Sequence, residues 1–373
     1  MKNRVLLIDF SNRLFGLDLM RATAIILVVL SHIRWLIPSR TENTESILST
    51  CGTIGVEIFF VLSGYLIGSI FLKQYFKSDL SSKSILNFWK RRWLRTLPNY
   101  YLILIVKILI FYFYFRYLPK IELWKYFFFI HNFNNELPLF FMESWSLSIE
   151  EFSYLLLPLS FVLISLLKNN NKEKLSSYVI LLLITLCFGF RVHYNNSDLG
   201  LSVYNWNHIL RTSVIYRIDA IFFGVLAANI HIRYKNYWNN YKPLYFLVGF
   251  IILILVNTLP LSLLSFENYS SFWNVYYFPI NSIAIGLTLP LLSSIETKSQ
   301  KILFPITFIS VISYSIYLIH YSIILYLMKY YFPTKGLNTS ELGLYIFIYL
   351  SVVIICSYLL YRFFEKPIMD LRN

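Results

Sequence analysis

Ten apolar runs, separated by polar connections, divide the chain. Each run is near the roughly 20 residues that an α-helix needs to cross the hydrocarbon core of a bilayer. The predicted spans are 17–36, 53–73, 97–117, 147–167, 176–194, 212–231, 243–264, 273–294, 306–328 and 343–363. The apolar stretch at 124–133 is too short to cross, so we expect it to lie at the interface or to re-enter the membrane. The pattern predicts an all-α fold, a polytopic membrane bundle of about ten transmembrane helices.

Composition and charge agree with this class and orient the bundle. Of 373 residues, 57% are hydrophobic and only 14% are charged, while the net charge is +14. Lysines and arginines gather before the first span, after the last, and in the second-to-third, fourth-to-fifth and sixth-to-seventh connections. By the positive-inside rule that side is the cytoplasm. We therefore expect both termini in the cytoplasm and a lipid bilayer, not nucleic acid, as the partner.

The first predicted span carries two residues that are costly in hydrocarbon, Arg21 and His32. Eleven residues make about three helical turns plus about 20°, so both side chains share one helix face, about 16 Å apart along the axis. This spacing predicts a cation near one membrane surface and an imidazole nearer the other. Such an arrangement suits an anion site on one side and acid–base chemistry on the other. The alternative for His32 is a buried polar residue that only bonds a neighbouring helix.

Four other spans are expected to bring ionisable residues to the depth of His32. These residues are Glu57, Glu150, Glu151, Arg217, Asp219 and His320. Neighbouring helices with a short connection are antiparallel, so Glu57 is expected opposite His32, about four residues from the outer end of its span. Each residue has a structural alternative: the adjacent glutamates as helix caps, the arginine–aspartate pair as an ion pair, the second histidine as an interfacial residue. Their convergence nevertheless favours a functional layer.

A second cluster is predicted on the cytoplasmic side. Arg92 and Arg95 lead into the third span and are three residues apart, so they share a face if the segment is helical. They are expected near Arg21. Attraction to inner-leaflet lipids is the alternative explanation for this charge. The functional interpretation is a phosphate site, because guanidinium groups match phosphate oxygens. In the fifth-to-sixth connection, Arg191 and Arg211 break the charge rule and are further candidates.

Several other functions are disfavoured. The three cysteines are far apart and the six histidines have no ligand spacing, so neither a disulfide framework nor a metal site is expected. No internal repeat is visible, which argues against an inverted-repeat transporter. A transporter or flippase for an anionic or glycosylated substrate is the alternative function, since it also uses intramembrane charges.

An ordered set of segments resembles the membrane acyltransferase-3 family, from about residue 14 to residue 368. LDLMRATAIILVVLSHI resembles its first-span motif, a basic residue, ten positions, then histidine, met by Arg21 and His32. RRWLRTLP resembles its R-x-x-R motif, met by Arg92 and Arg95. ESWSLSIEEFSYLLLP resembles a third motif. The matching residues there are Trp145, Ser146, Glu150 and Pro158. GVEIFFVLSGYLIG, RIDAIFFG, SYSIYLIH and FFEKP resemble further family segments.

The resemblance implies an O-acyltransferase of the bacterial inner membrane that uses acyl-CoA, usually acetyl-CoA, and no metal. The implied acceptor is a sugar hydroxyl of a glycan or glycolipid, such as O-antigen, another surface polysaccharide or a lipid-linked oligosaccharide. Some family members carry a periplasmic esterase-like domain after the last span. We expect residues 1–373 to form a single membrane domain without it.

The resemblance and the predicted depths together suggest roles. His32 would be the general base, with Glu57 or Glu150 orienting it, and a covalent acyl-histidine is an alternative. Arg21, Arg92 and Arg95 would hold the CoA phosphates. The remaining residues predicted to contact substrate are Trp145, Glu151, Arg217, Asp219, Tyr317 and His320.

Overall fold

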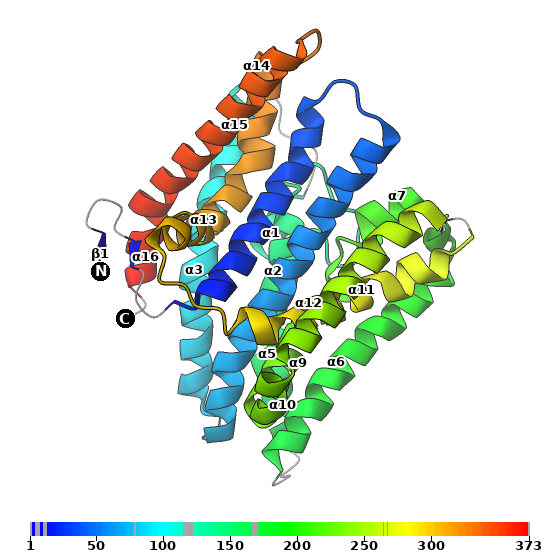
Figure 1. Cartoon of the computed structure of the whole chain (residues 1–373), viewed down its shortest axis with the longest axis vertical. Coiled ribbons are helices and arrows are strands. Elements are labelled where there is room, and N and C mark those ends of the chain that lie inside the picture. The colour runs from blue at the N-terminus through cyan, green and yellow to red at the C-terminus, as the bar shows by residue number, and fades with distance from the viewer. Residues whose placement is uncertain are drawn as a thin grey trace.

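The computed structural model describes residues 2–3, 8–9, 13–77, 80–114, 116, 122–165, 171–263, 265–266 and 268–371. These residues form a bundle of long, tilted helices (Figure 1). Within the described residues, nine helical stretches are long and apolar enough to cross a membrane. They are Phe15–Leu36, Glu42–Lys77, Ser82–Phe113, Ser144–Ser165, Lys172–Asn195, Val214–Arg233, Phe272–Leu292, Gln300–Tyr331 and Thr339–Asp370. A shorter apolar helix covers Lys242–Thr258. The predicted polytopic helical bundle is confirmed.

The elements follow one another with short connections. The α-helices are α1 (Phe15–Ile33), α2 (Glu42–Lys77), α3 (Ser82–Leu109), α4 (Trp124–Phe127), α5 (Ser144–Ser165), α6 (Lys172–Asn195), α7 (Val203–Asn205), α8 (Val214–Arg217), α9 (Asp219–Arg233), α10 (Lys235–Asn240), α11 (Lys242–Leu263), α12 (Tyr277–Leu292), α13 (Gln300–Ile319), α14 (Tyr326–Tyr331), α15 (Thr339–Leu360) and α16 (Lys366–Asp370). Turns of 3₁₀-helix are η1 (Arg34–Leu36) and η3 (Asp198–Leu201). Turns of π-helix are η2 (Ile110–Tyr114), η4 (Trp206–Leu210), η5 (Phe272–Tyr276), η6 (His320–Leu325) and η7 (Tyr361–Glu365). Strands β1 (Lys2–Asn3) and β2 (Ile8–Asp9) pair antiparallel near the N-terminus.

Each predicted span corresponds to a helix, but two helices begin much earlier than predicted. Helix α2 begins at Glu42 rather than near 53, and α3 begins at Ser82 rather than near 97. The far ends of the third and fourth predicted spans, at 115, 117 and 166–167, lie outside the described residues. The stretch 124–133 holds only the four-residue helix α4 and does not span. The early starts lengthen α2 and α3 beyond the apolar runs that predicted them.

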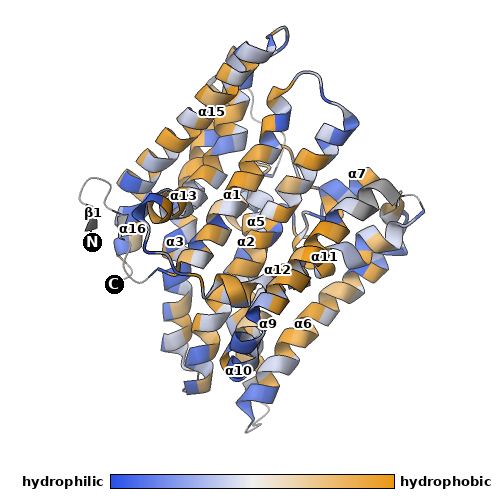
Figure 2. Cartoon of the chain, viewed as in Figure 1, coloured by the Kyte–Doolittle hydropathy of each residue, from blue (hydrophilic) through white to orange (hydrophobic). Residues whose placement is uncertain are grey.

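Helices α1, α2 and α9 form the centre of the bundle. Helix α1 packs against α2 and α13, while α2 packs along α9. Glycines permit the close approach of α2 and α9: a Cβ on Gly64 would lie 1.9 Å from the carbonyl oxygen of Ile221, and one on Gly224 would lie 2.1 Å from that of Val61. Small residues at helix contacts are typical of membrane bundles. Figure 2 shows apolar residues along the helices and many hydrophilic residues at their ends.

Candidate active site

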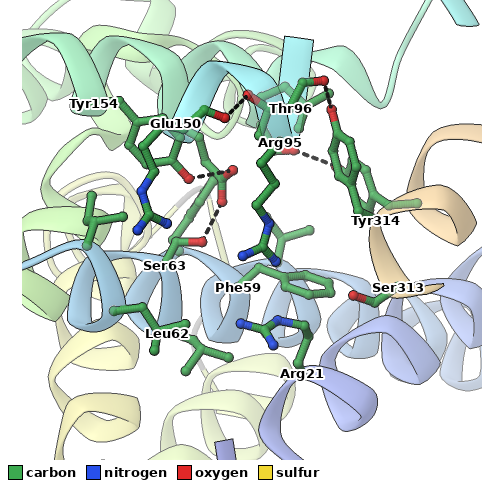
Figure 3. A pocket seen from close by; sticks show the side chains of 18 residues that line it. Arg21, Phe59, Leu62, Ser63, Arg95, Thr96, Glu150, Tyr154, Ser313 and Tyr314 are labelled. Carbon is green, nitrogen blue, oxygen red and sulfur yellow. Dashed lines mark hydrogen bonds between the residues drawn. The ribbon is translucent and has the colours of Figure 1, made fainter. Parts of the chain in front are cut away.

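A narrow cavity of about 80 Å³ lies where α1, α2, α3, α5 and α13 meet. We call it the arginine cavity, because Arg21 of α1 and Arg92 and Arg95 of α3 belong to its lining. Figure 3 shows the side chains of Arg21 and Arg95 extending toward one another from different helices. The three arginines that the sequence assigned to one anion site therefore lie together.

The arginine cavity has more basic than acidic groups in its lining. Arg21 Nη1 lies 3.5 Å from Asp18 Oδ1, but that oxygen also lies 2.5 Å from Arg13. Among the described lining residues, Glu150 is the one carboxylate, and it accepts a hydrogen bond from Ser63 at 2.7 Å. Guanidinium groups that face one another with so little acidic compensation favour a bound anion with several oxygens, such as phosphate.

His32 and His320 form a pair near the C-terminal end of α1. His320 Nδ1 lies 3.0 Å and 2.9 Å from the carbonyl oxygens of Ile316 and Tyr317. A carbonyl only accepts, so the neutral ring of His320 carries its proton on Nδ1 and accepts on Nε2. His32 Nδ1 lies 3.2 Å from that Nε2 and 2.9 Å from the carbonyl oxygen of Val28, so it donates to them. This assignment from partners leaves the lone pair on Nε2 of His32, where a proton can be accepted.

Both histidines line a second cavity, of about 490 Å³, which we call the histidine cavity. Its other charged lining includes Arg34, Arg211, Glu45 and Glu143. Burial, followed by repulsion from Arg34, lowers the pKa of Arg211 to about 10, so this side chain is still charged at neutral pH. Such mixed polarity suits a ligand that both donates and accepts hydrogen bonds, as a sugar does.

Glu143 is a buried carboxylate in the lining of the histidine cavity. It lies directly before α5, is only 4% exposed, and its Oε1 accepts a hydrogen bond from the backbone N–H of Ser322 at 2.8 Å. Glu143 and both histidines line the same cavity. A buried carboxylate beside a histidine stabilises the imidazolium that forms when the pair takes up a proton.

The two cavities adjoin. Val56 of α2 and Tyr317 of α13 belong to the lining of both. The Tyr317 hydroxyl lies 2.6 Å from the Ser146 hydroxyl, which lines the arginine cavity. The arginines and the histidine pair therefore line two neighbouring cavities that share the side chains of Val56 and Tyr317.

The comparisons with known proteins identify the family. The family model described as an acyltransferase domain matches residues 14–362. The chain belongs to the acyltransferase-3 family. Its apolar helices make it a multi-pass membrane protein of that family.

Relatives of this acyltransferase are named as O-acetyltransferases. The O-acetyltransferase OatA of Staphylococcus aureus (strain NCTC 8325 / PS 47) is 27% identical over 376 residues, which cover 95% of this chain and 57% of OatA. The putative O-acetyltransferase SACOL0978 of Staphylococcus aureus (strain COL) is 27% identical over 390 residues, covering 94% of this chain and 56% of that protein. The chain thus spans little more than half the length of these curated relatives. No solved structure gives a significant match.

The sequence misplaced two glutamates of this acyltransferase. Glu150 and Glu151 were expected beside His32, but Glu150 lines the arginine cavity and Glu151 accepts a hydrogen bond from Thr96 of α3 at 2.6 Å. Helix α5 begins at Ser144, so Glu150 lies six residues, about 9 Å, beyond the start of the helix rather than at its outer end.

Glu57 was likewise expected opposite His32, and it is not among the groups that His32 bonds. It lies fifteen residues after the start of α2, forms an ion pair with Arg217, and accepts a hydrogen bond from Ser282 at 3.2 Å. The Arg217 guanidinium stacks 3.5 Å from the ring centroid of Phe278. This geometry gives Glu57 a place in a buried network between helices.

Asp219 pairs with Arg191 of α6 at 2.7 Å, rather than with Arg217 as the structural alternative supposed. All four side chains of the two ion pairs are at most 2% exposed. Neither Arg217 nor Asp219 belongs to the described lining of the two cavities, which speaks against the contact with substrate that the sequence suggested.

Of the remaining predicted substrate residues, Trp145, Tyr317 and His320 line the histidine cavity, whereas Glu151 is in the described lining of neither cavity. The Arg211 guanidinium lies 5.9 Å from the ring centroid of Trp145. Sequence reasoning missed Glu143, although it lies only two residues before Trp145 in a segment already singled out. In the part of the chain that the structure describes, no group of three or more His, Cys, Asp or Glu side chains could hold a metal ion.

Proposed function

We propose that this membrane acyltransferase moves an acetyl or other short acyl group from cytoplasmic acyl-CoA to a sugar hydroxyl of a glycan. The observation that carries the proposal is the junction of the arginine and histidine cavities at Val56 and Tyr317. An anion site that opens onto an acid–base pair is what transfer from a phosphorylated donor to a hydroxyl requires. The relatives named as O-acetyltransferases support the acyl group and the oxygen acceptor.

The arginine cavity is the proposed donor site. Arg21, Arg92 and Arg95 bind phosphate oxygens of CoA, with the nucleotide toward the cytoplasm. The cavity is narrow, at about 80 Å³, so it suits an extended thioester arm better than a nucleotide. Arg21 and His32 are eleven residues apart on α1, a rise of about 16 Å, which the arm must cover. Glu150 balances part of the arginine charge there.

The histidine cavity is the proposed site of reaction. Nε2 of His32 takes the proton from the acceptor hydroxyl as its oxygen attacks the thioester carbonyl carbon. The new C–O bond forms, the C–S bond breaks, and the CoA thiolate leaves and takes the proton back from His32. His320 accepts the hydrogen bond from Nδ1 of His32 throughout. Glu143 stabilises the positive charge while it lies on the pair.

The proposed membrane is the bacterial inner membrane, with both termini in the cytoplasm. This orientation rests on the basic residues of the alternate connections. It puts the arginine cavity toward the cytoplasm, where acyl-CoA is made, and the histidine cavity toward the outer side. The acyl group therefore crosses most of the bilayer while it is attached to the donor arm.

A deletion strain tests the proposal even while the acceptor sugar is unidentified. Mass spectrometry of its surface glycans should show the loss of an acetyl mass, restored by the unchanged gene. His32→Ala should not restore it, and the purified variant should turn over acetyl-CoA about 10²–10⁴-fold more slowly. His193→Ala, on an exposed position of α6, is the matched control and should behave as the unchanged protein. Full activity in His32→Ala would overturn the mechanism.

A further inference from the structure

A third hollow opens sideways between the α1–α2 pair and the α11–α12 pair, with a volume of about 1010 Å³. We call it the lateral groove. It faces the bilayer, because Ile47, Phe250 and Ile254 in its lining are 61%, 49% and 47% exposed. On α2 the lining runs from Glu42 to Ile58. That distance is about 24 Å along the helix.

The lateral groove is apolar along most of its length and polar at one end. Among its described lining residues, Glu42 alone is charged, and it lies at the first turn of α2 with Asn43 and Ser46. A long apolar chain with a polar head at this end would match the groove. Its polar end lies on the same side of the bundle as the histidine pair, because α2 begins just after the segment that follows His32.

The polar end leads into a second hollow of about 750 Å³, which we call the vestibule. Groove and vestibule share the lining residues Glu42, Ser46 and Thr50. The vestibule is also lined by aromatic rings. These are Trp206, Trp273 and Tyr277. Aromatic rings with a polar atom suit the alternating apolar and hydroxyl-bearing surfaces of a sugar.

The vestibule in turn adjoins the histidine cavity. The two share Glu45, Ser49 and Asn207 in their linings. The lateral groove, the vestibule and the histidine cavity therefore follow one another as neighbouring hollows, each sharing lining residues with the next. This series of hollows approaches the histidine pair from a different direction than the arginine cavity, so donor and acceptor need not pass one another.

We propose that the lateral groove binds the lipid chain of a glycolipid acceptor, whose glycan extends through the vestibule to present a hydroxyl to His32. This inference rests on the proposed function and names its acceptor class. A plain phospholipid would use the groove alone, whereas a vestibule of about 750 Å³ between groove and histidines provides room for a glycan. The lipid chain of the acceptor already lies in the apolar bilayer, so it gains no hydrophobic free energy when it enters the groove. The role of the groove is to position the acceptor.

A chain-length comparison tests the site. The full chain in lipid nanodiscs is given acetyl-CoA and either a hexadecyl glycoside or the methyl glycoside of the same sugar, over a panel of sugars. The hexadecyl glycoside should be the better acceptor by at least tenfold. Ile254→Trp narrows the groove and should remove that advantage without changing transfer to the methyl glycoside. Leu182→Trp, on a 53% exposed position of α6 outside the groove, is the matched control and should change neither.

A photoreactive hexadecyl glycoside gives a second readout that does not need turnover. It should label peptides of α11 and α12 in the unchanged protein and in Leu182→Trp, but not in Ile254→Trp. Equal labelling by a photoreactive phospholipid, or equal use of both acceptors by all variants, would overturn the inference. Labelling of the groove with no transfer to any sugar would instead overturn the proposed function and leave the groove as a glycolipid site.

Discussion

At the scale of residues, the direction of one hydrogen bond decides what His32 can do. Two backbone carbonyls fix the proton of His320 on Nδ1, which makes its Nε2 an acceptor for His32. The basic atom of His32 is thereby set by two acceptors together, the Val28 carbonyl on its own helix and His320 on α13–η6. His32 and His320 are separated by most of the sequence, so no local sequence pattern predicts their contact.

Replacement of His320 by Phe should therefore lower kcat with little change in KM for acetyl-CoA. The aromatic ring keeps the packing but removes one of the two acceptors of His32 Nδ1, so the Val28 carbonyl alone holds the ring and its tautomer. A loss of about 10–100-fold is expected, as for other orienting partners of histidine. His320→Gln, which keeps an acceptor, should recover part of it. If His320→Phe matched the unchanged protein in rate and pH profile, His32 would not depend on this contact.

A substitution in the arginine cavity should change KM for acetyl-CoA, whereas the histidine substitution should change kcat. In the proposed donor site, Arg95→Ala removes a charged hydrogen bond to a phosphate of acetyl-CoA, worth about 1.5–3 kcal/mol, so KM for acetyl-CoA should rise by about 10–100-fold. Arg91→Ala, four residues earlier on α3 at an exposed position outside the cavity, is the matched control. Steady-state rates over a range of acetyl-CoA concentrations measure both. A normal KM in Arg95→Ala would separate this arginine from the donor.

At the scale of elements, the contact between α2 and α9 sets the frame for the site. Helix α2 supplies Ser63 and Val56 to the arginine cavity and Glu57 to the buried ion pair with α8. Its approach to α9 depends on Gly64 and Gly224, where a Cβ would meet a backbone carbonyl rather than a flexible side chain. A backbone cannot move aside without shifting its helix, so these positions tolerate no larger residue.

Gly224→Ala should therefore destabilise the bundle by about 1–3 kcal/mol, the usual effect of overpacking. Thermal unfolding in detergent measures it. Gly286→Ala on α12 is the matched control, because a Cβ there meets nothing within 4 Å. It should be neutral or slightly stabilising, since alanine is the better helix former. Equal stability of the two variants would show that α2 and α9 can separate at no cost.

At the scale of the whole molecule, two buried ion pairs connect helices that are distant in the sequence. Glu57–Arg217 joins α2 to α8, and Arg191–Asp219 joins α6 to α9. A charge in this interior is tolerated only with its partner. The pairs therefore specify which helices are neighbours, an arrangement that apolar packing in lipid specifies weakly.

Glu57→Gln should lower stability by about 3–5 kcal/mol, because the Arg217 charge is left buried without a counter-charge. Glu57→Gln combined with Arg217→Met should regain much of this loss. Thermal unfolding of both variants measures stability, and acetyl transfer by the same variants measures catalysis, so the two effects can be told apart. A stable but inactive Glu57→Gln would return Glu57 to the catalytic role that the sequence suggested.

The fold was largely predictable and the depth of its residues was not. Hydropathy finds helices only where they are apolar, and both α2 and α3 begin with polar turns that project beyond the apolar run. A signal was present for α3: Ser81 and Ser84 form a capping box. A helix that starts there places Arg92 and Arg95 on one continuous helix with the third predicted span. The contacts of Glu57 and the contact between the two histidines depend on how each helix is rotated about its own axis. A helix that is apolar on all sides has no polar face from which this rotation could be predicted.

Directly at His320, helix α13 widens into the π-turn η6, which holds about one more residue per turn than an α-helix. Loss of a single codon within 320–325 lets this segment close into regular α-helix, and the residues after it keep nearly the same rotation about the helix axis, because five residues at about 100° each turn the chain about as far as six residues of the wider turn. Such a deletion should therefore leave the bundle folded but move the side chains of the turn itself, so acetyl transfer should fall while thermal unfolding changes little.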